Sequence, residues 1–368
     1  MVEKRPIDKL TIKGFKTLKD VELELGKLNV LIGPNGAGKS NLISYFHMLQ
    51  EIVGSRLRIW TGSQGGANRV MTFGAKNARV ITTEIWFGSD SYAFTLKHSS
   101  AEDRFIFTEE FLIYGIEERD MYSFGSGHDE AILRLHTRPN ATNPRVADFA
   151  YVAFSNFRFY HFHDTGDKAL LKQTQSLFDD RYLRPDAQNL AAYLHMLSEF
   201  HEDTYHDIVR TVQLAVPFFD DFVLIPKEIR PDEHTIQLLW KHPESDIPFG
   251  ASQLSDGSLR FICLVTALMQ PDPPSTIIID EPELGLHPYA ISLLGSLLET
   301  ASERMQVIVA TQSPQLLDEF SVDDLIVVEL EDGVSVFKRL RECDFNVWLK
   351  DFSVGELWDK NVLGGGLP

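Results

Sequence analysis

The segment that most constrains the fold of this chain is GPNGAGKS, at positions 33–40. An apolar run, KLNVLIG, leads into it, and the run predicts a buried strand. The residues that follow, NLISYFHMLQEIV, place their apolar side chains at helical spacing. Glycines allow the tight turn that points successive N–H groups at one place before a helix. The segment therefore predicts a strand, a phosphate-binding loop and a helix.

The loop at positions 33–40, called the phosphate loop below, predicts bound ATP with Mg²⁺. Lys39 would bring positive charge to the β and γ phosphates, and Ser40 would offer its hydroxyl to Mg²⁺. The candidate nucleotide-binding residues here are Gly33, Pro34, Asn35, Gly36, Ala37, Gly38, Lys39, Ser40 and Asn41.

A second motif, IIIDEPE, carries two carboxylates at the end of an apolar run. Open α/β sheets bind ligands at the carboxyl ends of their strands. Asp280 would hold the metal through its water shell, and Glu281 would orient or deprotonate the attacking water. Acidic residues also simply end strands, but the phosphate loop upstream favours the chemical interpretation.

The segment LSDGSLR, at positions 254–260 and called the signature below, is weaker evidence alone because its residues also form turns and helix caps. It begins the helical segment LRFICLVTALM, whose positive N-terminal end suits phosphate. Ser255 and the backbone of Gly257 would contact the γ phosphate held by another protomer.

Composition excludes several classes of protein. The chain has 368 residues, 43% of them apolar, without an apolar run suited to a signal peptide or a membrane span, so we expect a cytoplasmic protein. Its two cysteines, Cys263 and Cys343, form no metal motif, and we expect buried structural thiols. The net charge of −18 opposes broad binding to DNA, so any such contact needs a local basic patch.

Strand and helix patterns alternate in a way that predicts an α/β fold with a mainly parallel sheet. Runs from ARVITTEIWF to RFIFTEEFLIYGI predict an antiparallel β-meander, and 54–74 is interpreted as a mobile loop. VAFSNFRFYHFH is interpreted as strand-like, and a hairpin is expected to turn at Asp332-Gly333. We divide the chain into an N-terminal lobe (1–164), an inserted helical lid (165–219) and a C-terminal lobe (220–368).

The order of GPNGAGKS, LSDGSLR, IIIDEPELGLHP and VIVATQS resembles ABC-type ATPases of the branch that contains the SMC, RecF-like and OLD (overcoming lysogenization defect) proteins. FRFYHFHDTG, SDGSLRFICL, DEPELGLHP and WLKDFSVGELWDKNVLGGG resemble more specifically the bacterial stand-alone group AAA-21. The resemblance covers almost the whole chain. It implies an ABC-type P-loop core and an ATP-dependent head-to-tail homodimer, or a higher homo-oligomer, with two ATP molecules between phosphate loop and signature.

The resemblance also implies roles for two further segments. Residues 285–288 would form a seam loop at the dimer interface, and Thr311, Gln312 and Ser313 a switch segment that senses the γ phosphate. With Gln312 where many relatives have histidine, we expect slow hydrolysis, because glutamine cannot carry charge. The predicted catalytic set is thus Glu281, Lys39 and Gln312.

Several assignments stay open at the level of sequence. The HFHD stretch at 161–164 is interpreted as a link between lid and nucleotide, a metal site or packing, and alternative candidates for the linking glutamine are Gln64, Gln173 and Gln175. His287 would contact the dimer seam or begin a helix. Lys13 and Phe15 would flank adenine, or serve the surface and the core.

The function that we expect is an ATP-gated dimeric switch, and the family resemblance alone implies that it acts in phage defence or DNA maintenance. The residues after the last hairpin are too few for the nuclease domain of OLD proteins, so a separate effector, such as a nuclease, is expected. The alternatives are the nucleotide-binding subunit of a transporter, or an ATP-liganded scaffold or toxin regulator.

Overall fold

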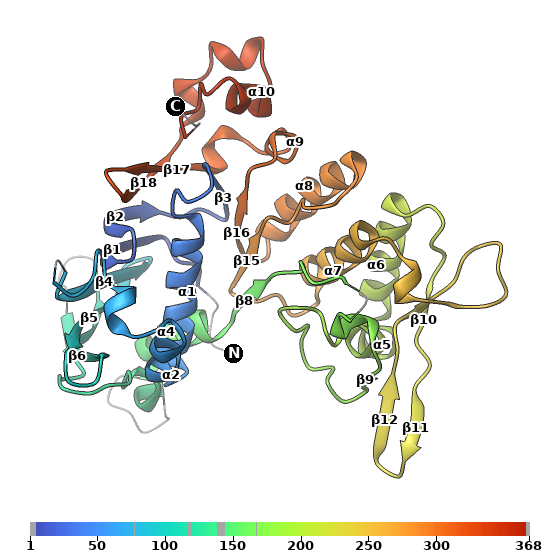
Figure 1. Cartoon of the computed structure of the whole chain (residues 1–368), viewed down its shortest axis with the longest axis horizontal. Coiled ribbons are helices and arrows are strands. Elements are labelled where there is room, and N and C mark those ends of the chain that lie inside the picture. Colours follow the sequence, from blue (N-terminus) through green and yellow to red (C-terminus); the bar gives the residue numbers. More distant parts are fainter. Residues whose placement is uncertain (1–4, 77, 116–119, 138–143, 167, 366–368) are drawn as a thin grey trace.

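The computed structural model describes residues 5–76, 78–115, 120–137, 144–166 and 168–365. Its central six-stranded sheet has the order β18-β17-β3-β16-β15-β8, and every pairing is parallel except β17 with β18 (Figure 1). The strands are β3 (Leu28–Ile32), β8 (Phe157–Tyr160), β15 (Thr276–Asp280), β16 (Gln306–Thr311), β17 (Leu325–Glu331) and β18 (Val334–Arg339). The predicted α/β fold with a mainly parallel sheet is confirmed.

Alternate side chains of this sheet enter two different cores. Ile278 and Ile308 pack on the side of α1 (Lys39–Val53) and α4 (Pro144–Ser155). Ile277 and Val307 pack on the side of α7 (Asp256–Met269) and α8 (Pro288–Ser302). Because both faces are covered, β3 and β16 are buried along their whole length, and most of their residues are apolar.

The expected β-meander belongs to a second, antiparallel sheet of order β2-β1-β4-β5-β6-β7. Its strands are β1 (Lys9–Phe15), β2 (Leu18–Glu24), β4 (Val80–Phe87), β5 (Asp90–Ser99), β6 (Arg104–Tyr114) and β7 (Asp120–Ser123). The first two strands alternate between buried and exposed residues, as predicted. They join the meander rather than the central sheet.

Two local predictions were wrong. The segment at 54–74 is not an irregular mobile loop, because it contains the helices α2 (Leu57–Ser63) and α3 (Ala67–Val70). Each helix buries only two side chains, too few to produce a readable period. The first four residues of VAFSNFRFYHFH belong to α4, and the strand itself is only β8.

Helices α5 (Leu190–Phe200) and α6 (Glu202–Ala215) form the helical part of the segment expected to be a lid. Their buried side chains belong to the same core as α7 and α8, and Figure 1 shows the four helices together on one side of the central sheet. The domain boundaries at 164 and 219 stay predictions.

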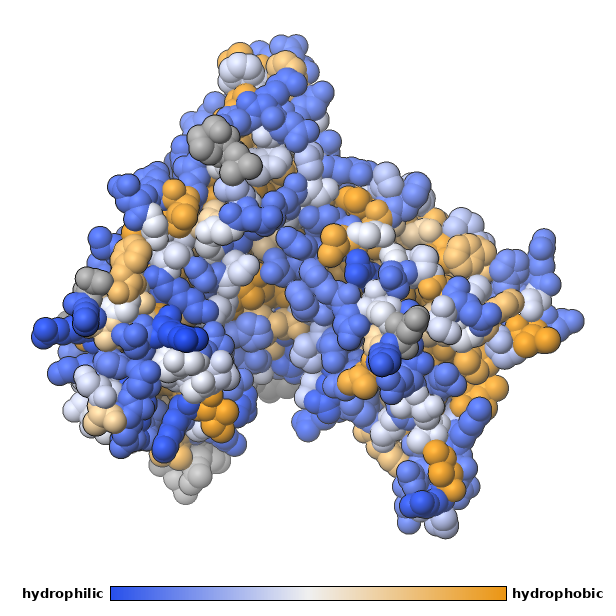
Figure 2. All heavy atoms as spheres, viewed as in Figure 1, coloured by the Kyte–Doolittle hydropathy of each residue, from blue (hydrophilic) through white to orange (hydrophobic). Residues whose placement is uncertain are grey.

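Two small three-stranded sheets, of order β10-β13-β14 and β11-β12-β9, extend this helical side. Their strands are β9 (Gln175–Ser176), β10 (Phe222–Val223), β11 (Lys227–Arg230), β12 (Glu233–Ile236), β13 (Leu239–Trp240) and β14 (Phe249–Gly250). The hairpin β11–β12 projects from the molecule, and Figure 2 shows the surface hollowed between this side and the antiparallel sheet.

The C-terminal part contains α9 (Pro314–Leu317) and α10 (Val354–Asp359). Strands β17 and β18 form the predicted hairpin, with positive φ at Asp332 (49°) and Gly333 (78°). Of the two thiols, Cys263 is buried but Cys343 is exposed, so the expectation that both are buried was wrong. Cys343 lies in a short 3-10 turn that buries no side chain. Every helix of the described residues is too short or too polar to span a bilayer.

Candidate nucleotide site

The structure brings the phosphate loop, the acidic strand end and the switch segment to one pocket. The pocket is lined by Pro34, Asn35, Gly36, Gly38, Lys39, Ser40, Asn41, Asp280, Glu281 and Gln312. Three neighbouring parallel strands explain this meeting, because β3, β16 and β15 end at the same edge of the sheet. Strand ends far apart in the sequence thus become neighbours at one edge of the sheet.

The turn after β15 holds Glu281 in an unusual backbone conformation. Its φ is 46°, in the left-handed region that side chains other than glycine rarely adopt. The Glu281 N–H donates to the carbonyl oxygen of Ala310 at 2.8 Å, which anchors the turn to β16. The Gln312 side-chain amide donates to Asn35 Oδ1 at 2.7 Å and to Glu281 Oε1 at 3.4 Å. Gln312 therefore links the phosphate loop to the acidic strand end.

The phosphate loop rests on two hydroxyls that the sequence did not reveal. Ser335 Oγ donates to the Ala37 carbonyl oxygen at 2.6 Å and lies 2.6 Å from Thr17 Oγ1. The Asn41 amide in turn donates to Thr17 Oγ1 at 2.7 Å. Gly38 has φ 120°, and a Cβ there would lie 2.0 Å from Ser335 Oγ, so glycine is required by both conformation and space. Asn41 thus supports the loop from behind as well as lining the pocket.

Lys39 is 6% exposed and folds back over its own loop. Its ammonium group donates to the Gly33 carbonyl oxygen at 2.5 Å and to that of Pro34 at 3.2 Å. Burial lowers the pKa of Lys39, and the carboxylates of Asp280, Glu281 and Glu283 oppose that shift. The Lys39 ammonium, bonded to the carbonyls of its own loop, is therefore available to a phosphate chain that binds in the pocket.

The donor set fits magnesium. The Ser40 hydroxyl and the Asp280 carboxylate line the same pocket, and Mg²⁺ prefers such oxygen ligands together with water and substrate phosphates. Burial, followed by the neighbouring Glu281 carboxylate, raises the pKa of Asp280. A cation bound there would relieve both effects, since it stabilises the ionised carboxylate.

Glu283 is a further carboxylate that sequence reasoning missed. Its Oε1 accepts from the Thr311 hydroxyl at 2.6 Å and from the Gln312 N–H at 3.4 Å. Its Oε2 is buried without a hydrogen-bond partner, and burial raises the pKa of Glu283. The signal was present in the third acidic letter of DEPE, two residues after Glu281. Glu283 therefore connects the acidic turn to Thr311 and Gln312 of the switch segment. Ser313, the last residue of that segment, is the N-cap of α9.

The paired histidines lie against the acidic strand end. His161 and His163 stack with ring centroids 3.8 Å apart, and His163 Nε2 lies 3.4 Å from the Asp280 carbonyl oxygen. Burial and His163 lower the pKa of His161, while Asp280 and Glu281 oppose that shift. Within the described part of the chain no group of three His, Cys, Asp or Glu residues is placed to hold a metal, so the metal interpretation of His161, His163 and Asp164 gains no support.

The candidate glutamines have other partners. Gln64 Oε1 accepts from the Lys16 ammonium at 3.2 Å, and the Gln173 amide donates to the Lys168 carbonyl at 2.8 Å. Gln175 is buried, and its Oε1 accepts from the Ala191 N–H at 3.0 Å at the start of α5. Gln64, Gln173 and Gln175 do not line the nucleotide pocket in the described residues.

The signature lies outside this pocket. Ser255 caps α7, with its Oγ accepting from the Ser258 N–H at 3.1 Å, and Gly257 lies in the first turn. Neither residue is among those that line the nucleotide pocket. Figure 1 shows α7 on the helical side of the molecule, while α1 with the phosphate loop covers the opposite face of the central sheet.

Arg260 connects the signature to two other segments. Its guanidinium donates to the Leu284 carbonyl at 2.8 Å, and to the carbonyls of Phe162 and His163, each at 3.1 Å. Arg260, on α7, therefore bonds both to the segment of the paired histidines and to the residue that precedes the seam loop. A movement of α7 would therefore shift the acidic turn through the bond from Arg260 to the Leu284 carbonyl.

Two open assignments have structural answers. His287 is the N-cap of α8, where Nδ1 accepts from the Tyr289 N–H at 3.3 Å, so it begins a helix. Phe15 is fully buried against Tyr45 and Trp60, so it belongs to the core and does not flank adenine. Lys13 pairs with Asp20 at the surface, at 3.2 Å.

Comparison with known proteins identifies the family. A family model described as "AAA domain, putative AbiEii toxin, Type IV TA system" (AAA_21) matches residues 28–318. The chain belongs to this AAA_21 family. The match runs from β3 to the end of α9 and so contains the phosphate loop, the signature, the acidic strand end and the switch segment.

A curated relative and two solved structures agree with that placement. The "OLD nuclease" of Thermus scotoductus is 24% identical over 370 residues, which cover 92% of this chain and 65% of the relative. An SMC head bound to the C-terminal winged-helix domain of ScpA has TM-score 0.57 at 17% identity, covering 92% of this chain and 99% of the other. An SMC head with an extended coiled coil, bound to a ScpA domain derived from Pyrococcus furiosus, has TM-score 0.55 at 15% identity, covering 94% and 99%. The fold is therefore that of SMC heads, an ABC-type P-loop ATPase fold.

Proposed function

We propose that this protein binds and slowly hydrolyses ATP to ADP and phosphate, and that it closes head-to-tail as a homodimer around two nucleotides. The observation that carries the proposal is the division of the site. One chain assembles the phosphate loop, Asp280, Glu281 and Gln312 in a single pocket, while Ser255 and Gly257 lie on a helix outside it. A second chain would supply the missing signature, and the family supports such an arrangement.

Each residue would have a defined task in the closed dimer. Lys39 would exchange its loop carbonyls for β and γ phosphate oxygens, and Ser40 with Asp280 would hold Mg²⁺, which neutralises phosphate charge when bound. Glu281 would take a proton from, or orient, the attacking water, with Gln312 positioning its carboxylate through the 3.4 Å contact. Gln312 would also sense the γ phosphate as part of the switch segment.

Mixed mutants test the shared site. Lys39→Ala disables the phosphate loop of its own chain, whereas Ser255→Arg blocks the signature that a chain offers to its neighbour. Each variant alone should lack ATPase activity. In a mixture, one of the two sites in a heterodimer combines an intact phosphate loop with an intact signature, so activity should return. Failure of mixing to restore turnover, when both variants are folded, would contradict the shared site.

We further propose that the closed dimer controls a separate effector in phage defence or DNA maintenance. The relative named OLD nuclease supports this role, and the chain spans 65% of the length of that relative. The family description, which names a toxin system, favours regulation of a toxin as a second candidate. Co-purification of the Glu281→Gln variant with and without ATP would distinguish the two candidates. The activity of a partner protein that is retained only with ATP would show whether that partner is a toxin or another effector.

A further inference from the structure

A second pocket lies away from the nucleotide, between the C-terminal end of α1, α4, β8 and the loop at 182–185. It has a volume of about 530 Å³, and its polar lining includes Arg56, Arg134, Arg158, Arg184, Tyr151 and Tyr182. A neighbouring pocket of about 690 Å³ shares Arg158 and Tyr182 with it. The two pockets therefore adjoin, and together they form what we call the arginine groove.

The first pocket of the arginine groove is unusual in a chain of net charge −18, because no Asp or Glu is among the described residues that line it. Asp180 and Asp272 line the second pocket, together with Arg158 and Arg181. Arg158 donates to the carbonyl oxygens of Phe157 at 2.9 Å and Ser155 at 3.4 Å, rather than to a carboxylate. Arg56 and Arg184 pair with carboxylates, at 2.6 and 2.7 Å. Burial lowers the pKa of His47 to about 4, so this lining residue adds no charge at neutral pH. Arg158, which lines both pockets, therefore brings to the groove a positive charge that is bonded to backbone carbonyls.

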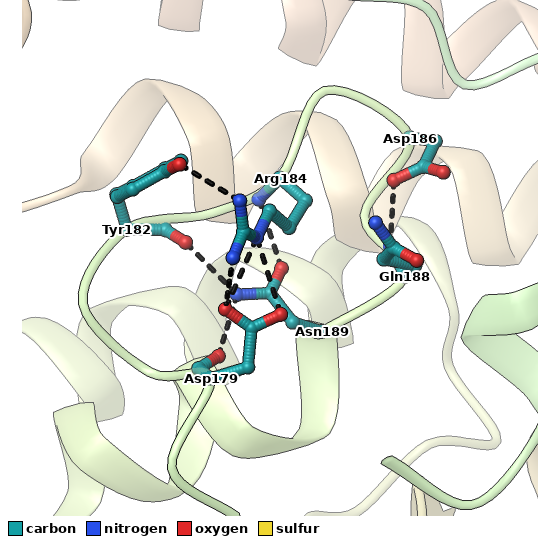
Figure 3. A network of polar contacts seen from close by, with 6 residues as sticks. All are labelled: Asp179, Tyr182, Arg184, Asp186, Gln188 and Asn189. Carbon is teal, nitrogen blue, oxygen red and sulfur yellow. Dashed lines mark hydrogen bonds and ion pairs between the residues drawn. The ribbon is translucent and has the colours of Figure 1, made fainter. Parts of the chain in front are cut away.

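An aromatic ring stands beside that charge. The guanidinium carbons of Arg158 and Arg184 each lie 4.9 Å from the centre of the Tyr182 ring. Arg184 also donates to the Tyr182 hydroxyl at 2.8 Å and to the Asp179 carboxylate at 2.7 Å, as Figure 3 shows. Guanidinium groups next to an aromatic face are the pairing that proteins use to bind phosphates and stack bases.

The loop that carries Tyr182 and Arg184 is held in place before any ligand binds. The Asn189 amide, buried at 1% exposure, donates to the carbonyls of Asp179 at 2.7 Å and Tyr182 at 2.8 Å. Its Oδ1 accepts from the Arg184 N–H at 2.8 Å (Figure 3). A binding residue fixed in this way loses little entropy on binding, so the loop is preorganised for a ligand.

We propose that the arginine groove binds a single-stranded segment of nucleic acid, with phosphates near Arg158 and an unpaired base against Tyr182. Two adjoining pockets that share one arginine and one tyrosine suit consecutive nucleotides better than one compact anion. A single strand is favoured over a duplex because stacking on a side chain requires a base whose face is free. This site goes beyond the proposed ATPase function and does not depend on it.

The groove is coupled to the nucleotide site through shared elements. The Gln50 amide, near the end of α1, donates to the Phe157 carbonyl of β8 at 2.9 Å. The same helix begins at Lys39, and β8 leads directly to His161 and His163 beside Asp280. A bound strand would therefore touch both elements that border the nucleotide.

The test is binding of the full chain, without ATP or Mg²⁺, to a labelled single strand of about 12 nucleotides, measured by fluorescence polarisation over a range of salt. Arg158→Gln and Tyr182→Ala should each weaken binding about tenfold or more. Arg158→Gln should also reduce the slope of log affinity against log salt by about 0.7. The matched control is Arg210→Gln, which removes the same charge from an exposed position on α6 and should change affinity less than about twofold.

Competition distinguishes the ligands. Unlabelled single strand should displace the probe at a low concentration. Duplex, mononucleotide or inorganic phosphate should each need a much higher concentration to displace it. Equal competition by duplex, or by a mononucleotide, would overturn the proposal of a strand. So would an equal loss in Arg210→Gln, or wild-type protein that fails to bind at low salt. Because nucleotide is absent, none of these outcomes bears on the ATPase proposal.

Discussion

Gly257 packs so closely against Gly285 that a Cβ on Gly257 would lie 2.2 Å from the Gly285 carbonyl oxygen. Gly285 itself has φ 77°, in the region that favours glycine, and the Leu284 carbonyl next to it accepts from Arg260 at 2.8 Å. The signature helix and the seam loop are thus fitted to each other backbone to backbone. Movement of one requires movement of the other.

We therefore expect Gly257→Ala to separate the signature from the seam loop. Because the added methyl group meets backbone, the variant should lose about 1–3 kcal/mol of stability and most ATPase activity while still binding ATP. Gly62→Ala is the control, since apart from its own helix backbone and its chain neighbours no atom lies within 4 Å of its Cβ position. Urea unfolding and ATP turnover measure both effects. Unchanged turnover in Gly257→Ala would show that the close contact is irrelevant to hydrolysis.

Glu281→Gln should bind ATP but turn it over slowly. The amide keeps the size of the side chain and can still contact Gln312, but it cannot take a proton from water. We expect a rate loss of about 10²-fold or more, and an ATP-dependent dimer that persists in size-exclusion chromatography with light scattering. A variant that stays monomeric with ATP and Mg²⁺ would argue against closure by nucleotide.

Glu283→Gln should raise stability in a pH-dependent way. Burial raises the pKa of Glu283 in the folded state, so its ionised form disfavours folding, and the wild type loses stability as pH rises through that pKa. The neutral amide escapes this loss and still accepts from Thr311. Thermal unfolding without nucleotide should show the variant above the wild type at pH 8, with the difference shrinking towards pH 4. A constant difference would mean that ionisation is not the cause.

The sequence predicts the parts of the site that depend on strand ends, and misses those that depend on packing. Asp280, Glu281 and Gln312 follow apolar runs, and parallel strands bring such positions to one edge. Thr17 and Ser335 support the phosphate loop across 318 positions of sequence, and no local pattern records that contact. Helices α2 and α3 are short, so their apolar period is absent. Tyr182 and Arg184 become a binding feature only after Asn189 has shaped their loop.

Ser335→Ala tests whether the support behind the phosphate loop matters for ATP. The change leaves the buried Ala37 carbonyl without its 2.6 Å hydroxyl donor and removes a partner of Thr17, which in turn holds Asn41. We expect a loss of about 1–3 kcal/mol in stability and weaker ATP binding, because the loop must now be ordered by the nucleotide itself. Ser63→Ala, an exposed serine in α2, is the control. If denaturant unfolding shifts while titration with labelled ATP is unchanged, the two hydroxyls stabilise the fold without shaping the loop.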